Sequence, residues 1–100
     1  MKITVANKHH GAVGEYIGRG SPLGNPSPIT PLNTRYQAIE NYKVWLADKI
    51  KTNDERVCTE LNRLANIVHE TGELTLVCFC KPHACHGDVI RQVILEAFKE

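Results

Sequence analysis

The sequence predicts a single small α/β domain, Rossmann-like, in which a short and mainly parallel sheet is flanked by helices. The first observation is a nearly continuous apolar segment at residues 74–80, which is typical of a strand covered on both faces in a parallel sheet. The second is the helical spacing of apolar residues in three other segments. The third is the length, because 100 residues suffice for one core and therefore for one domain, residues 1–100.

Two short strands are expected before the first helix. Ile3 and Val5 alternate with Lys2 and Thr4, which predicts a strand at residues 2–6, and residues 15–18 predict a second, shorter strand. Residues 19–28 cannot form regular structure because proline and glycine recur throughout them. A long loop is therefore expected between the second strand and the first helix.

A helix is predicted from Arg35 to about Lys51, with Asn33 or Thr34 as its N-cap. Its apolar residues recur at helical spacing. They are Tyr36, Ile39, Leu46 and Ile50, with Tyr42 and Trp45 flanking them.

A second helix is expected to begin after Asn53 or Asp54 and to end at Gly72, the residue that most easily adopts the left-handed closing conformation. A third helix is expected to follow Gly87. The apolar stripes of the two helices are Val57, Leu61, Leu64 and Val68, then Val89, Ile90, Val93, Ile94, Ala97 and Phe98.

The composition argues against several kinds of partner. Twelve basic and eleven acidic residues leave a formal charge of +1, so no bulk electrostatic attraction to nucleic acid or to a membrane surface is expected. No apolar run approaches the roughly twenty residues that span a bilayer. The start of the chain does not resemble a signal segment and the four cysteines gather toward one end. Reduced thiols and a cytoplasmic location are therefore expected.

Two unusual segments are expected to meet at one edge of the sheet. We call residues 18–26 the Gly/Pro loop and residues 78–88 the Cys/His segment. The Cys/His segment lies between the carboxyl end of a strand and the amino end of a helix. A right-handed crossover from the first strand to the strand at 74–80 would bring both segments to the same sheet edge. Open α/β sheets bind ligands there.

The Gly/Pro loop has the residue types of a ligand cradle. Its glycines, Gly18, Gly20 and Gly24, permit backbone conformations and close approaches that side chains forbid. Ser21 and Asn25 supply hydrogen-bonding groups, and Arg19 offers a planar, permanently charged fork for phosphate or carboxylate. The same residue types also form ordinary surface turns, so the loop indicates a ligand only together with the Cys/His segment.

The Cys/His segment holds three cysteines and two histidines within nine positions. Cys80 or Cys85, near a helix amino end and beside basic groups, would have its thiolate favoured, with His86 or His83 as the base. Cys78 is interpreted as a small buried hydrophobe. Asp88 is expected to favour the helix dipole rather than to catalyse.

Zinc is the alternative interpretation of the same side chains. Cys78 and Cys80 are two apart on a strand and so share a face, and Cys85 with His83 or His86 could complete a tetrahedral set. Against zinc, the Cys-x-Cys spacing differs from the usual Cys-x-x-Cys knuckle, and the chain has no second knuckle. No metal ligand is assigned on this basis.

The two segments also resemble the paired signatures of a known family. YIGRGSPLGNP at residues 16–26 and CFCKPHACHGD at residues 78–88 are similar to the motifs of DUF4326, a small bacterial and phage family of unknown function. Phe79 stands where the family pattern has tryptophan. The resemblance extends over almost the whole chain and includes Asn7 and Lys8, which the predicted topology places at the carboxyl end of the first strand, in reach of a ligand. It implies a shared site without an established activity.

The expected function is binding, with or without turnover, of an anionic nucleotide-like or nucleoside-like small molecule in a crevice between residues 18–26 and 78–88. Arg19, Ser21 and Asn25 would hold the anion or sugar. An enzyme at this site would transfer a glycosyl or other group with a thiolate or imidazole assisting, using Cys80, Cys85 and His86. The alternative is a zinc-stabilised, non-catalytic module that contacts another protein or nucleic acid.

Overall fold

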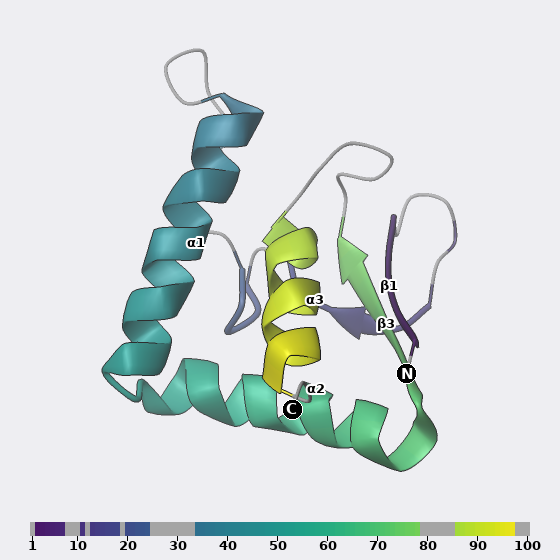
Figure 1. Cartoon of the computed structure of the whole chain (residues 1–100). Helices are drawn as coiled ribbons and strands as arrows, with labels where there is room; N and C mark the ends of the chain where they lie inside the picture. The colour runs from purple at the N-terminus through teal and green to yellow at the C-terminus, as the bar shows by residue number, and fades with distance from the viewer. Residues whose placement is uncertain are drawn as a thin grey trace.

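A computed structural model of the chain describes residues 2–7, 11, 13–18, 20–24, 34–78 and 86–97 (Figure 1). In these ranges the elements are β1 (Lys2–Asn7), β2 (Glu15–Tyr16), α1 (Arg35–Lys51), α2 (Glu55–Thr71), β3 (Glu73–Cys78) and α3 (His86–Ala97). The predicted order of strands and helices is confirmed. The predicted continuation of the last strand to Cys80 lies outside the described residues. Within those ranges, none of the helices has the length and apolar character needed to cross a bilayer.

The strands of the described residues form an open, entirely parallel sheet with β3 in its centre, between β1 and β2. Asn7 at the end of β1 lies opposite Cys78 at the end of β3, and Tyr16 of β2 lies opposite Val77. The three carboxyl ends therefore share one edge of the sheet. This confirms a small α/β fold, whereas the Rossmann-like description stays a prediction because so short a sheet does not distinguish it from other α/β folds.

Short-range polar contacts fix where α1 and α2 begin and end. Thr34 caps α1 in a capping box, in which its hydroxyl accepts from the Gln37 amide at 3.2 Å and the Gln37 side chain accepts from the Thr34 amide. The Asp54 carboxylate caps α2 by accepting from the Val57 amide at 3.0 Å. Gly72 ends α2 at φ 77°, as predicted.

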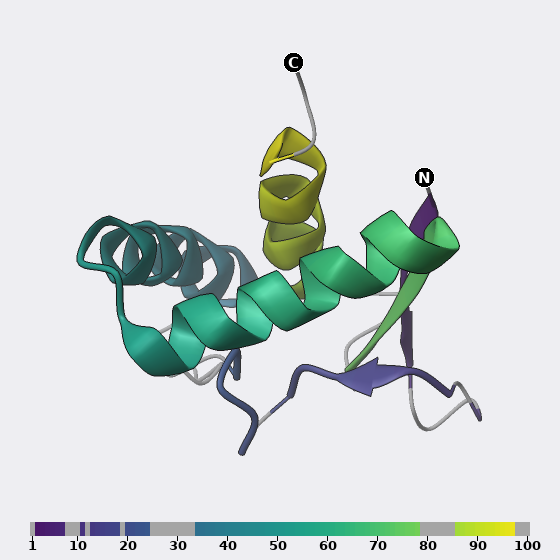
Figure 2. The same cartoon turned by 90° about the horizontal axis from the view of Figure 1, so that it is seen from below.

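One hydrophobic core joins the helices to one face of the sheet. Leu74, Leu76 and Cys78 alternate along β3, so their side chains share a face, and they pack with Ile3 of β1. The helical members of this core are Tyr42, Leu46, Val57, Leu61, Leu64, Val68, Val89, Ile90 and Ile94. Figure 2 shows α1, α2 and α3 on the same side of β2. The segment that follows β2 leaves the sheet at the carboxyl end of β3, where the Ile17 amide donates to the Val77 carbonyl.

The predicted apolar face of α1 is wrong in two places. Tyr36 was expected to face the core but is 78% exposed, and Ile50 is 40% exposed. The buried face is centred instead on Tyr42, with Ala38 and Leu46 one turn to either side. Tyr36 lies two residues from Ala38 and therefore points to the other side of the helix. Tyr42, which was predicted to flank the apolar face of the helix, is therefore at the centre of its buried face.

Candidate functional site

The carboxyl edge of the sheet brings buried polar and sulfur-containing side chains together. Asn7, the last residue of β1, is 8% exposed, and its register partner Cys78 is buried in the core. Ile17, which directly follows β2, donates its amide to the Val77 carbonyl at 3.0 Å. The Gly/Pro loop therefore leaves the sheet at the same edge at which β1 and β3 end.

The described part of the Gly/Pro loop is compact and internally bonded. The Ser21 amide and hydroxyl both donate to the Gly18 carbonyl, at 3.0 and 2.8 Å, and the Gly24 amide donates to the Ser21 carbonyl at 3.0 Å. Gly20 has φ +94°, a conformation that L side chains rarely adopt. A Cβ on Gly24 would lie 2.6 Å from the Gly18 carbonyl oxygen. Gly20 and Gly24 thus occupy positions that disfavour a side chain.

Two buried side chains hold this loop to the helices. The Tyr42 hydroxyl of α1 donates to the Leu23 carbonyl at 2.7 Å, and Nε2 of His86, at the start of α3, lies 2.6 Å from the Ile17 carbonyl. The two rings pack edge to face with centroids 5.0 Å apart. Ile17 directly precedes the Gly/Pro loop and His86 belongs to the Cys/His segment, so this contact joins the base of the loop to that segment.

His86 has the electrostatics of a neutral, positioned imidazole. Its ring is 7% exposed, and this burial lowers its pKa, against the opposing effects of the Ile17 carbonyl and the negative charge of Asp88. A neutral ring that donates from Nε2 to a carbonyl keeps its lone pair on Nδ1. In this neutral form Nε2 is the donor and Nδ1 the acceptor of the His86 ring.

The predicted start of the last helix is wrong by two residues. A helix was expected after Gly87, yet α3 already includes His86 and the buried Gly87. The His86 ring, at the first position of α3, contacts the carbonyl of Ile17, the residue directly before the Gly/Pro loop.

The structure places only some of the predicted site residues. Asn7, Gly20, Ser21, Gly24 and His86 lie at the sheet edge or in the loop that leaves it. Those outside the described residues are Lys8, Arg19, Asn25, Cys80, His83 and Cys85.

A metal centre receives no support from the part of the chain that the structure describes, where no three potential His, Cys, Asp or Glu ligands come together. Cys78 is 1% exposed and belongs to the hydrophobic core. This agrees with its interpretation as a small buried hydrophobe. The remaining ligands of the zinc alternative, Cys80, Cys85 and His83, lie outside the described residues.

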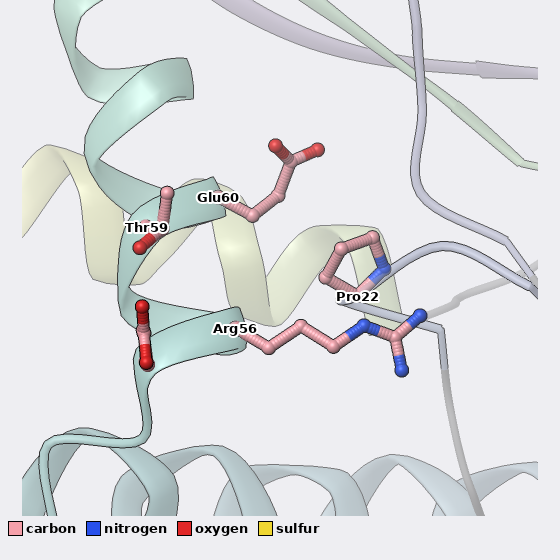
Figure 3. A pocket seen from close by; sticks show the side chains of 5 residues that line it. Pro22, Arg56, Thr59 and Glu60 are labelled. Atoms are coloured by element: carbon pink, nitrogen blue, oxygen red, sulfur yellow. The ribbon is translucent and has the colours of Figure 1, made fainter.

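A pocket of about 490 Å³ between Pro22 of the Gly/Pro loop and α2 was not predicted (Figure 3). It lies between Pro22 and the first turns of α2, and Arg56 extends along Pro22. Glu55 and Glu60 also line it, and Glu60 pairs with Arg63 at 2.6 Å. Because the pocket contains both carboxylates and a guanidinium, it is not a selective anion site. Arg56 nevertheless adds a guanidinium next to the Gly/Pro loop, besides that of Arg19 within the loop.

Replacing Tyr42 with phenylalanine should lower the free energy of unfolding by about 1–2 kcal/mol, because the Leu23 carbonyl loses a buried hydrogen-bond donor. Urea denaturation of the purified variant measures this loss. Tyr36→Phe is the matched control, since the Tyr36 ring is mostly exposed and the same change there should have almost no effect. Equal losses in the two variants would contradict the assigned role of Tyr42.

Comparisons with known proteins agree with the resemblance of the two motifs. No curated protein and no solved structure matches the chain. A family model does match, and its match covers residues 4–96, which include both the Gly/Pro loop and the Cys/His segment. The chain therefore belongs to the family described as Domain of unknown function (DUF4326).

Proposed function

We propose that this protein binds an anionic, nucleotide-like or nucleoside-like small molecule at the carboxyl edge of its sheet, between residues 18–26 and 78–88. The observation that carries the proposal is the contact between His86 of the Cys/His segment and Ile17, the residue directly before the Gly/Pro loop. It ties the start of α3 to the base of a loop in which Gly20 has φ +94° and Gly24 approaches the Gly18 backbone too closely for a side chain. Helix amino ends and glycine-rich loops together are the usual elements of phosphate sites in α/β proteins.

Rigidity of the loop supports binding rather than a plain surface turn. The loop is anchored by Ile17 and Leu23, both fully buried, and by the buried hydrogen bonds of Tyr42 and His86. A surface turn needs no such anchors, whereas a preorganised loop binds its ligand at a lower cost in conformational entropy. Ser21 keeps its oxygen lone pairs for a ligand while its proton is donated to the Gly18 carbonyl.

Each side of the crevice has a distinct role in the proposal. Arg19, Ser21 and Asn25 hold the phosphate or sugar, with Asn7 and Lys8 at the end of β1. Cys80, Cys85 and His86 form the selective or reactive side. Turnover, where it occurs, is transfer of a glycosyl or other group from the bound molecule, assisted by a thiolate or by Nδ1 of His86.

Thermal unfolding of the purified chain with adenosine, AMP, ADP, ATP, ribose 5-phosphate and inorganic phosphate tests the proposal. A ligand at about a hundred times its dissociation constant stabilises a folded chain by about 2.7 kcal/mol, so at least one phosphate-bearing compound should raise the melting temperature. Adenosine should have a smaller effect than AMP. No response to any compound would contradict the proposal, and stoichiometric zinc in protein purified without chelator would favour the zinc-stabilised module instead.

Two arginine variants locate the ligand. Arg19→Ala should abolish the stabilisation by the responding compound and leave the melting temperature of the free protein unchanged. Arg56→Ala is the matched control, because Arg56 lies next to the same loop but in the pocket of Figure 3. Loss of the response in the Arg56 variant alone would move the ligand to that pocket and refute the proposed position.

A further inference from the structure

A groove of about 700 Å³ runs between α1 and α3, outside the proposed ligand crevice. Figure 1 shows both helices descending from their amino to their carboxyl ends, and Figure 2 shows that their axes cross at an angle. The floor of the groove is apolar and consists of Ile39, Ala47 and Ile50 from α1 with Val89 and Val93 from α3. Nothing among the described residues covers it.

Exposed apolar side chains extend this surface along α1. Ile50 in the groove is 40% exposed, and Val44, three residues from Ala47 and thus on a neighbouring part of the same helix face, is 71% exposed. Tyr36 adds a mostly exposed ring at the beginning of the helix. Several exposed large apolar side chains on one helix are typical of a surface that contacts another molecule.

The two walls of the groove carry opposite charge. Lys43 and Lys51 line it on the α1 side, whereas Asp88 and Glu96 line it on the α3 side. Lys43 also pairs with Glu40 at 3.1 Å, but both side chains are exposed, and such a surface pair contributes little and exchanges readily. A partner that fits this groove should therefore present an acidic wall opposite α1 and a basic wall opposite α3.

The chain itself presents that pattern. A two-fold axis along the groove places α1 of one copy over α3 of the other, so that each basic wall meets an acidic wall. Because α1 and α3 both descend in the view of Figure 1, Lys51 of one copy then lies toward the same end as Glu96 of the other. A two-fold axis across the groove would instead bring like charges together. We infer that the protein forms a homodimer through this groove, with α1 of each copy against α3 of the other.

Sedimentation equilibrium of the full chain at about 10–500 µM tests the dimer. The expected result is a monomer–dimer equilibrium that shifts with concentration. Ala47→Glu, which adds a charge to the apolar floor at an exposed helical position, should weaken the dimer at least about tenfold. Glu70→Lys, an exposed position on α2 outside the groove, is the control and should leave the dimer unchanged.

A charge exchange tests the orientation of the two copies. Lys51→Glu and Glu96→Lys should each weaken the dimer, and the double variant should recover most of the loss because the opposite charges are restored across the interface. A wild-type chain that stays monomeric over the whole range would overturn the inference and assign the groove to a different partner. A dimer that Ala47→Glu leaves intact, or a double variant without recovery, would overturn it too.

Discussion

Replacing Gly24 with alanine should lower the free energy of unfolding by about 1–3 kcal/mol and abolish ligand binding. The added Cβ would lie 2.6 Å from the Gly18 carbonyl oxygen and 3.2 Å from the Ser21 carbonyl oxygen. Both atoms belong to the backbone of the same loop, so neither can move aside as a flexible side chain would. The Gly18 carbonyl also accepts from Ser21, and relief of the clash would break that turn.

The variant Gly20→Asn is the control for Gly24→Ala, because it replaces a glycine of the same loop without creating a steric collision. Gly20 has φ +94°, but a Cβ there meets no atom within 4 Å, and asparagine tolerates left-handed conformations better than most residues. We expect a loss of less than about 1 kcal/mol for this variant. Urea denaturation gives both values, and thermal shift with the responding nucleotide gives the binding. A Gly24→Ala variant as stable as the Gly20→Asn variant would show that the loop is looser than its hydrogen bonds imply.

The order of the elements could be predicted from the sequence because it depends on local patterns. The stripe of α2 and its cap at Asp54 involve residues only a few positions apart, and the closing role of Gly72 follows from its own backbone freedom. The parallel orientation of β1 and β3 was expected from a topological rule rather than from any residue pair. These predictions needed no knowledge of long-range side-chain contacts.

The way the site is held together could not be predicted in the same manner. The Tyr42 hydroxyl bonds to a carbonyl 19 residues away and the His86 ring to one 69 residues away. Any residue can supply a backbone carbonyl, so the sequence gives no signal for these partners. A hint existed for Tyr42, since a tyrosine in an apolar helical stripe must satisfy its hydroxyl when buried. For His86 the polar ring favoured a reactive interpretation, and its burial against Ile17 was missed.

Replacing His86 with alanine should also have a large effect and lower the free energy of unfolding by about 2–4 kcal/mol. The variant leaves the Ile17 carbonyl without its donor and removes the ring that packs on Tyr42. Ligand binding should fail as well, because this contact holds the base of the Gly/Pro loop to the start of α3. His69→Ala, at an exposed position in the last turn of α2, is the matched control and should change stability little.

The pH dependence of unfolding tests the same contact independently of ligand. Burial lowers the pKa of His86 below its ordinary value of 6.5, so below that pH the unfolded chain binds the proton more readily than the folded chain. The stability that the neutral ring confers is therefore fully present above pH 6.5, and it is lost as the pH falls from there toward the folded-state pKa. Urea denaturation of the wild type and of His86→Ala between about pH 8 and pH 5 measures this slope. The slope should be reduced in the His86 variant; an identical slope in the two proteins would mean that His86 is not the buried titrating group.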